Sequence, residues 1–242
     1  MNIIVTGGST FMPIDKVRGI TNIFKGRTAC DITKEAIKRK HNVCLIGNKE
    51  MFSKINGDLP SNIESSLSLL HYYTYDMLYE KMFDIITGTN FKPDVVIHSS
   101  AVSDYKVKRV LSSLDENLAL DRSKKISSEH KIMYLELEQT EKIIDKIRDP
   151  WGFKGILVKF KLQVGMKDQE LIDIANKSIR KSDADVIVAN CLEWAHEKAY
   201  IISKRMNGEY PLTVVNRGDL ASSLIRTVEE IASVSRYSWL LR

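Results

Sequence analysis

A glycine pair stands near the start of the chain, directly after a short apolar run. The run at residues 2–5 predicts a buried strand, and Gly7 and Gly8 follow it. Glycines at the end of a first strand let backbone N–H groups approach a phosphate closely, so this pair is a candidate nucleotide site. A tight turn without a ligand explains the pair equally well. The spacing matches neither the G-x-x-x-x-G-K-[ST] phosphate loop nor the G-x-G-x-x-G dinucleotide motif.

A carboxylate follows a second apolar run. Residues 94–98, introduced by Pro93, predict a strong buried strand, and Asp104 comes shortly after it. A carboxylate beside a buried strand is costly unless it is paired, which favours a functional role for Asp104. Ligands of parallel α/β sheets collect at the carboxyl ends of the strands. The segments after Thr6 and after Ser100 are therefore the expected borders of a binding site.

The elements that would position these residues alternate between apolar strands and amphipathic helices. This alternation predicts a mostly parallel α/β sheet with helices on both faces. Right-handed crossovers would make it doubly wound and Rossmann-like. The predicted strands lie at 2–5, 42–46, 68–73, 94–98, 132–138, 155–164 and 185–189, and the predicted helices at 28–40, 75–87, 141–148 (capped by Thr140), 168–181 and 219–232.

Three segments depart from the alternation. Residues 199–203 and 212–215 flank Asn207-Gly208 and predict a hairpin near the C-terminus. Residues 11–27 and 105–130 are polar with little periodicity, so they predict long irregular loops. Long loops in a compact domain are usually functional or disordered.

Composition is that of an ordinary soluble protein. Of the 242 residues, 43% are hydrophobic and 28% are charged. The net charge of +5 fits anionic small molecules, and no long Lys/Arg run indicates a nucleic-acid partner. No apolar run is long enough to span a membrane and no signal segment is present, so we expect a cytoplasmic protein. Cys30, Cys44 and Cys191 are too widely spaced for a disulfide framework or a zinc site.

Several blocks, in the same order, resemble motifs of the phosphopantothenate–cysteine ligase family (phosphopantothenoylcysteine synthetase, the CoaB/DFP type). The blocks are residues 13–22 (P-I-D-x-V-R-x-I-T-N), 101–105 (A-V-[SA]-D-[YF]), 124–128 (K-I-[SK]-[SK]), 160–162 (within G-F-K-L-E), 183–190 ([GN]-A-D-x-[IV]-V-A-N) and 196–200 (H-x-A-Y). The resemblance covers residues 1–232 as a single domain, followed by a tail at 233–242. It looks closest to the stand-alone bacterial form.

The resemblance implies a ligase of coenzyme A biosynthesis. Such an enzyme activates the carboxylate of 4'-phosphopantothenate with a nucleoside triphosphate as an acyl-nucleotide, and then forms an amide with cysteine. The stand-alone form implies CTP, and thus an acyl-CMP, rather than ATP, with Mg²⁺ as cofactor and a homodimer as the assembly. The first step gathers anionic groups and needs cations, and the second develops an oxyanion that needs a fixed donor.

The resemblance also assigns catalytic residues. Asn22 corresponds to the asparagine linked to acyl-nucleotide formation, Lys125 to the lysine of the second half-reaction, and Arg18 to an arginine that could clamp phosphate or carboxylate. Without the motifs, Asn22 would be a turn or cap residue, and the two cations would be surface charges. Because Lys125 lies in an irregular segment, we expect it on a flap that closes over the site.

A larger set is implied to bind the nucleotide. Phe160 could pack on the base or simply lie in the core, and Asn190 could contact the base or cap a turn. Lys177 and Lys181 could reach the triphosphate or line a solvated helix face. The nucleotide-binding residues are Gly7, Gly8, Ser100, Ala101, Asp104, Phe160, Lys177, Lys181 and Asn190, with Asp104 also the candidate metal ligand.

The chain departs from the family where its first motif continues as N-x-S-[ST]-G-x-x-G. Phe24 and Lys25 replace the two hydroxyl residues, and Lys25 and Arg27 could take over phosphate binding with charge. Further departures are Ala29 and Lys159 for glycines, Gln163 for a glutamate and Cys191 for an aspartate. These changes keep a second hypothesis open, a catalytically silent nucleotide-binding relative with a regulatory or assembly role. A short-chain oxidoreductase is disfavoured, because Arg109 stands where that class needs a lysine after Tyr105.

Overall fold

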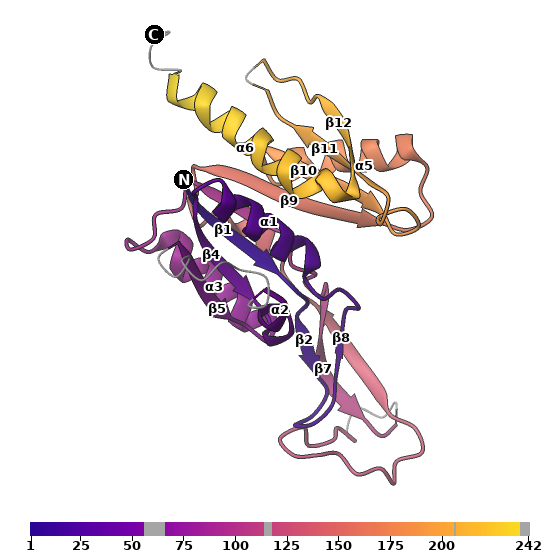
Figure 1. Cartoon of the computed structure of the whole chain (residues 1–242). Helices are drawn as coiled ribbons and strands as arrows, with labels where there is room; N and C mark the ends of the chain where they lie inside the picture. Colours follow the sequence, from indigo (N-terminus) through magenta and orange to yellow (C-terminus); the bar gives the residue numbers. More distant parts are fainter. Residues whose placement is uncertain (56–65, 114–117, 206, 238–242) are drawn as a thin grey trace.

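The centre of the protein is one eight-stranded sheet (Figure 1). The computed structural model describes residues 1–55, 66–113, 118–205 and 207–237. The strands are β1 (Asn2–Gly7), β4 (Asn42–Gly47), β5 (Leu67–His71), β6 (Val95–His98), β9 (Ile156–Gln163), β10 (Val186–Cys191), β11 (Lys198–Ser203) and β12 (Leu212–Asn216). Their order is β12-β11-β10-β9-β6-β1-β4-β5. The strands from β10 to β5 are parallel, and β11 and β12 form the predicted antiparallel hairpin.

Helices cover both faces of this sheet. One face carries α1 (Arg27–Lys38), α2 (Lys49–Ile55) and α6 (Leu220–Tyr237), and the other carries α3 (Tyr75–Thr87), α4 (Ile143–Lys146) and α5 (Asp168–Lys181). Alternate strand residues serve the two cores, since Ile3 and Val5 pack with α1 and α6 while Ile4 packs with α3 and α5. Burial on both sides explains why the inner strands β1, β4, β6 and β10 are mostly apolar. The predicted doubly wound, Rossmann-like fold is confirmed.

The order of the strands creates a switch point beside β1. The chain runs from β1 outward to β4 and β5, then returns to β6 on the other side of β1 and continues to β9 and β10. The crossovers therefore diverge between β1 and β6, which leaves a crevice at the carboxyl ends of these strands.

An arm projects from the carboxyl edge of the sheet (Figure 1). It consists of β2 (Phe11–Pro13) paired with β3 (Gly19–Thr21), β7 (Tyr105–Leu111) paired with β8 (Tyr134–Gln139), and the described residues between these strands. Met12, Val107, Val110 and Ile126 form a separate small core within it.

The predicted irregular loops at 11–27 and 105–130 are thus wrong in part, because each contains strand. The strand predicted at 132–138 is present, but it belongs to the arm rather than to the main sheet. A shift in register between Val107 and Arg109 breaks the period of two in β7, which explains the missing signal.

Two details at the helix ends differ from the sequence prediction. Thr140 does not cap α4, because its hydroxyl donates to the carbonyl of Ser103 at 2.7 Å and α4 begins after Lys142 without a side-chain cap. Helix α6 follows a 3-10 turn at Arg217–Asp219 and continues to Tyr237, beyond the predicted end at residue 232. Residues 238–242 of the predicted tail lie outside the described residues. Within the described part of the chain, no helix combines the length and apolarity needed to cross a membrane.

Candidate functional site

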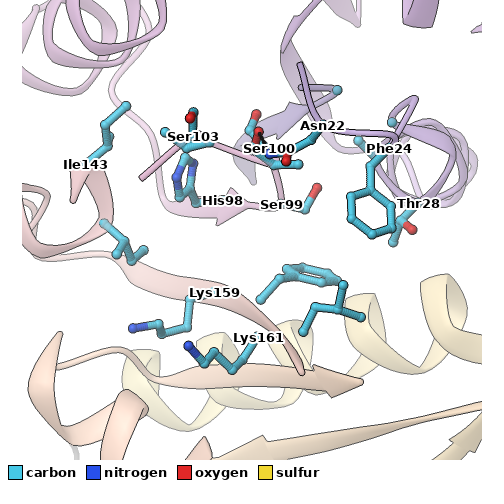
Figure 2. A pocket seen from close by; sticks show the side chains of 18 of the residues that line it. Asn22, Phe24, Thr28, His98, Ser99, Ser100, Ser103, Ile143, Lys159 and Lys161 are labelled. Carbon is cyan, nitrogen blue, oxygen red and sulfur yellow. Dashed lines mark hydrogen bonds between the residues drawn. The ribbon is translucent and has the colours of Figure 1, made fainter. Parts of the chain in front are cut away.

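A cavity of about 570 Å³ opens at the carboxyl ends of β1, β6, β9 and β10 (Figure 2). Its walls come from the turns after β1 and β6, the start of α1, the segment before α4, and the ends of β9 and β10. Small-molecule sites usually measure roughly 300–1,000 Å³, so the cavity suits a nucleotide-sized ligand. It lies at the switch point, where the sequence placed the binding site.

The glycine pair shapes the entrance to α1. A Cβ on Gly7 would overlap the Cβ of Ala29, so glycine lets α1 pack directly on β1. Gly8 has φ of +84°, a left-handed conformation that favours glycine, and its carbonyl accepts from the backbone N–H of Ala101 at 2.8 Å. Gly8 lines the cavity and Gly7 does not. Close packing at Gly7 and a left-handed turn at Gly8 therefore account for the pair, and Gly8 also borders the cavity.

Asn22 lines the cavity and is tied to the turn after β6 by a hydrogen bond. Its Nδ2 donates to the carbonyl of Ala101 at 3.1 Å, which joins the end of β3 to the turn after β6 (Figure 2). A side-chain amide carries two N–H donors, so one remains for a ligand. The side chain is otherwise exposed. Asn22 is thus a preorganised donor, which is the chemical role that the predicted catalytic asparagine needs.

The first turn of α1 forms one side of the cavity. Thr28 lies in this turn, and Phe24, which precedes the N-cap residue Gly26, lies beside it (Figure 2). Lys25 also borders the cavity, but its ammonium pairs with Glu50 at 2.8 Å, so its charge is already compensated. Arg217, which precedes α6, donates from Nη2 to the hydroxyl of Thr28. This arginine is a lining residue that the sequence did not predict.

The opposite side carries two buried titratable groups, His98 and Lys159, on neighbouring strands. His98 Nδ1 lies 2.8 Å from Thr6 Oγ1, and burial, with the charge of Lys159, lowers the pKa of His98 to about 4. Lys159 Nζ donates to the carbonyl of Ser178 at 3.1 Å and to Ser182 Oγ at 2.9 Å, and burial lowers its pKa to about 8. Near pH 7, His98 in the cavity wall is therefore neutral and Lys159 is positively charged.

Two carboxylates border the cavity, Asp104 and Glu141. Asp104 is exposed, so the expected cost of burying it does not arise. Among residues that the structure describes, no cluster of three or more His, Cys, Asp or Glu could hold a metal alone. Mg²⁺ is usually held by one or two carboxylates together with substrate phosphates and water. This donor set fits Mg²⁺ that arrives with a nucleotide, and Asp104 is a carboxylate at the cavity border that could reach it.

The cavity gathers most of the predicted site residues. Phe160 packs against the core beside α1. Asn190 is more informative, because its Oδ1 is buried without a hydrogen-bond partner at the cavity wall. An orphaned buried acceptor calls for a ligand donor. The predicted residues that line the cavity are Gly8, Asn22, Ser100, Ala101, Asp104, Phe160 and Asn190.

Other predicted residues lie outside the lining. Lys181 pairs with Asp145 at 3.3 Å and Lys177 is exposed on α5. Arg18 and Lys125 belong to the arm, where Lys125 is exposed. Their assignments stay predictions.

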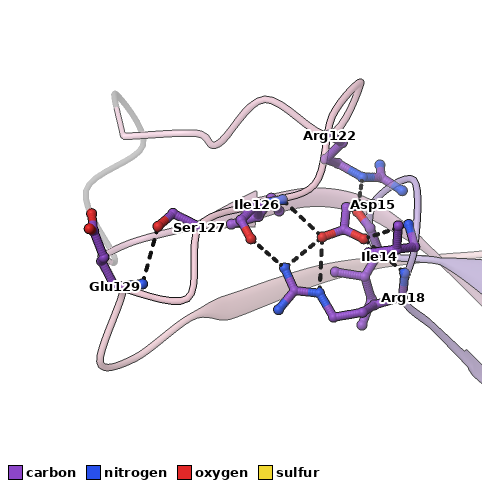
Figure 3. A network of polar contacts seen from close by, with 8 residues as sticks. Ile14, Asp15, Arg18, Arg122, Ile126, Ser127 and Glu129 are labelled. Atoms are coloured by element: carbon purple, nitrogen blue, oxygen red, sulfur yellow. Dashed lines mark hydrogen bonds and ion pairs between the residues drawn. The ribbon is translucent and has the colours of Figure 1, made fainter.

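Arg18 clamps a carboxylate of its own chain (Figure 3). Its Nε and Nη2 donate to Asp15 Oδ2 at 3.0 and 2.6 Å, and Nη2 also donates to the carbonyl of Ile126 at 2.9 Å. The backbone N–H of Ile126 donates to the same carboxylate at 3.0 Å. The guanidinium holds the pKa of Asp15 well below its usual range. This network locks the β2–β3 hairpin to the segment that carries Lys125.

Fold and site together define the class: a doubly wound α/β protein with a nucleotide-sized cavity at its switch point. The family described as the DNA/pantothenate metabolism flavoprotein C-terminal domain matches residues 1–231. The chain belongs to this family, as the motifs predicted.

Two curated relatives are coenzyme A biosynthesis bifunctional proteins CoaBC. That of Thermococcus kodakarensis is 30% identical over 232 residues, covering 95% of this chain and 51% of the relative. That of Methanocaldococcus jannaschii is 24% identical over 190 residues, covering 78% and 40%. The chain thus spans about half, or less, of the length of these relatives.

Solved structures support the fold over nearly the whole chain. The DNA/pantothenate metabolism flavoprotein from Streptococcus pneumoniae has a TM-score of 0.78 at 30% identity, covering 96% of this chain and 99% of that one. A Cab2 mutant in complex with phosphopantothenate-cysteine has a TM-score of 0.73 at 15% identity, covering 97% and 88%, and supports the fold alone.

Proposed function

We propose that the chain is a phosphopantothenate–cysteine ligase. Its family membership, its 30% identity to a pneumococcal protein of matching extent, and the coenzyme A biosynthesis role of its curated relatives support this activity. The single observation that carries the proposal is the position of Asn22. Its amide is held by Ala101 in a nucleotide-sized cavity with one N–H left for a reacting oxygen.

In the first step, a carboxylate oxygen of 4'-phosphopantothenate attacks the α-phosphorus of the nucleoside triphosphate. The new bond is O–Pα, the Pα–O bond to the β-phosphate breaks, and pyrophosphate leaves with the electron pair. Gly8 and the start of α1 receive the phosphates, while Phe160 and Asn190 border the base. Asp104 would hold Mg²⁺, which supplies positive charge to offset the phosphate oxygens.

In the second step, the amine of cysteine attacks the acyl carbon and the nucleoside monophosphate leaves. Negative charge builds on the carbonyl oxygen before the C–O bond to phosphate breaks. A fixed donor that faces this oxygen lowers the barrier because it needs no reorganisation. Asn22, which the family motif links to acyl-nucleotide formation, would hold the same carbonyl in both steps, and Lys125, which the motif assigns to the second step, would stabilise the oxyanion with its charge. The stand-alone bacterial resemblance favours CTP, and hence an acyl-CMP intermediate, over ATP.

We propose further that the ligase works as a homodimer. Arg18 and Lys125 lie on the arm, outside the lining of the cavity in their own chain. If they act in catalysis, the arm must reach a cavity, and that of a second copy is the simplest choice. The arm also exposes apolar side chains that a second chain would cover: Val17, Ile20, Tyr105, Ile132, Tyr134 and Leu137.

The direct test is pyrophosphate release with phosphopantothenate, Mg²⁺ and either CTP or ATP, with and without cysteine. We expect cysteine-dependent turnover that prefers CTP, and a loss of roughly 100-fold or more in Asn22→Ala, because a transition-state donor is removed. Asn42→Ala is the matched control, since Asn42 lies at the opposite end of β4 and bonds to Asn2. Equal activity of the two variants would remove Asn22 from the mechanism.

A second candidate function is a catalytically silent nucleotide-binding relative. The start of α1 favours it, because Phe24 replaces a hydroxyl and Lys25 is engaged by Glu50. In that case purified protein binds CTP or ATP but releases no pyrophosphate with either, whatever the cysteine concentration. Nucleotide binding and turnover measured on one preparation separate the two functions.

A further inference from the structure

The start of α1 lacks the hydroxyl pair that its family motif supplies. Phe24 has no hydrogen-bonding group in its side chain. Lys25, the other replacement, is held by Glu50 at 2.8 Å, and both side chains of that pair are largely exposed. Lys25 therefore borders the cavity, but its ammonium group is paired with a carboxylate.

A cation from the other end of the chain reaches the same turn. Arg217 follows β12 and begins the 3-10 turn that leads into α6. Its backbone N–H donates to the carbonyl of Glu197 at 2.7 Å, which fixes its position. From there its Nη2 donates to the hydroxyl of Thr28, and both residues line the cavity. Hence the fold joins the last sheet strand to the first turn of α1.

Among the described residues, no carboxylate forms an ion pair with this arginine. Arg217 is half-buried, and its described side-chain hydrogen bond goes to a neutral hydroxyl. Burial lowers its pKa, Asp31 acts in the opposite direction, and the neighbouring Arg27 lowers it further. Within the described ranges, no ion pair joins Arg217 or Arg27 to a carboxylate. A guanidinium has five N–H donors, so most of its donors remain for an anion.

Thr28 gains a defined orientation from this contact. Its Oγ1 accepts the hydrogen bond from Arg217, so the hydroxyl hydrogen is free to donate elsewhere. Thr28 lies in the first turn of α1, where backbone N–H groups also lack partners within the helix. An arginine, a hydroxyl and backbone donors thus converge at one wall of the cavity, a combination suited to phosphate oxygens.

We propose that Arg217 and Thr28 together bind the β- and γ-phosphates of a nucleoside triphosphate, in place of the hydroxyl pair missing from positions 24 and 25. That the ligand is a nucleoside triphosphate rests on the proposed function, but the match between these donors and phosphate oxygens rests on the cavity alone. Arg217 is then a substrate-binding residue that positions the leaving pyrophosphate. A nucleoside monophosphate bound in the same cavity lacks the β- and γ-phosphates and would not reach Arg217.

The test is equilibrium binding by calorimetry of CTP, ATP, CMP and inorganic tripolyphosphate. We expect Arg217→Gln to weaken both triphosphates and tripolyphosphate by roughly tenfold or more and to change CMP affinity by less than about twofold. Arg217→Lys should fall between, because it keeps the charge without the planar fork. Arg226→Gln on the exposed side of α6 is the matched control and should bind like the parent protein.

Loss of folding is separated from loss of binding by a second variant. Thr28→Val keeps the shape of the side chain and removes the hydroxyl, so it should weaken triphosphate binding selectively even if Arg217→Gln unfolds. Unchanged triphosphate affinity in either folded variant, or an equal loss for CMP, would overturn the assignment. If the protein releases no pyrophosphate but binds tripolyphosphate through Arg217, the ligase proposal fails and this inference stands. If Arg217→Gln instead turns over normally with an unaltered KM for CTP, the ligase proposal stands and this inference fails.

Discussion

His98 illustrates how one side chain couples the cavity to stability. Its ring is buried at the end of β6 against Thr6, and its pKa is lowered from 6.5 to about 4. In the unfolded chain the imidazole takes up a proton as the pH falls through 6.5, whereas the folded protein resists until about pH 4. The unfolded state therefore binds more protons in this window, and stability declines as the pH falls.

We expect the free energy of unfolding to drop by on the order of 2 kcal/mol between pH 7 and pH 4.5 because of this group. His98→Asn should lose that part of the pH dependence while keeping a polar contact with Thr6. Urea denaturation of both proteins across the window measures the difference. Parallel stability curves for the two proteins would show that His98 titrates normally in the folded state.

For individual residues, the sequence predicted which side chains belong to the site better than it predicted which side chains contact one another. Asn22, Asp104 and Asn190 follow predicted strands or motifs, and the fold brings them to one cavity. Arg217 and Lys159 were not predicted as site residues. The contact of Arg217 with Thr28 spans most of the chain, and no local pattern encodes it. In the sequence, Lys159 is only a charged residue within a strand, because its hydrogen-bond partners Ser178 and Ser182 come from α5 and its C-cap.

Among the elements, the arm depends on one buried carboxylate. Asp15 accepts from the backbone N–H groups of Val17, Arg18 and Ile126 as well as from the guanidinium of Arg18. Asp15→Asn removes the charge and one acceptor position, so the arm should open locally while the sheet, which has its own cores, stays folded. We expect roughly tenfold faster hydrogen exchange at the amide of Ile126, with little change at β1.

The pH dependence of this network has a defined sign. Because the folded pKa of Asp15 lies far below the unfolded value of 3.8, its contribution is present above that value and is lost as the pH falls well below it. In the parent protein, hydrogen exchange at the amide of Ile126 should therefore stay slow from pH 5 to pH 8, after correction for the pH dependence of the intrinsic exchange rate. Faster exchange of β1 than of the arm in Asp15→Asn would contradict the division into separate cores. Lys16→Gln, a neighbouring exposed substitution, is the control.

Regular elements were predictable where one physical signal dominated. Helices α3 and α5 begin and end at the predicted residues, since apolar positions at helical spacing mark one clear face. Of the arm strands, β8 was predicted, whereas β2 and β3 were missed because they are very short, and β7 was missed because it contains the register shift at Val107. The end of α6 was placed too early, because helix continuation past residue 232 has no stop signal to mark it.

At the level of the whole molecule, the proposed homodimer predicts complementation between inactive variants. Asn22→Ala damages the cavity and Lys125→Ala damages the arm, so each should be inactive alone. If the arm serves the cavity of a second copy, a mixed dimer has one intact combination. Equal mixing with random exchange should then restore about one quarter of the parent activity.

Analytical ultracentrifugation establishes that dimers form, and differently tagged chains establish that subunits exchange. A mixture that exchanges but stays inactive would mean that each arm acts on its own cavity or takes no part in catalysis. The sequence predicted a sheet and a flap. It did not predict how far the arm extends, because that depends on how two antiparallel strand pairs pack on each other through Met12 and Val107.

The cavity draws its walls from nearly the full span of the described chain, from Gly8 to Arg217. During synthesis on the ribosome, the parallel core from β1 to β10 can emerge and begin to pack well before Arg217 leaves the exit tunnel. A nascent chain at that stage holds the parallel strands but lacks β11, β12 and the Arg217 side chain at the cavity wall. Binding that depends on Arg217 therefore becomes possible only after the chain that leads into the last helix has docked beside the first helix, late in folding.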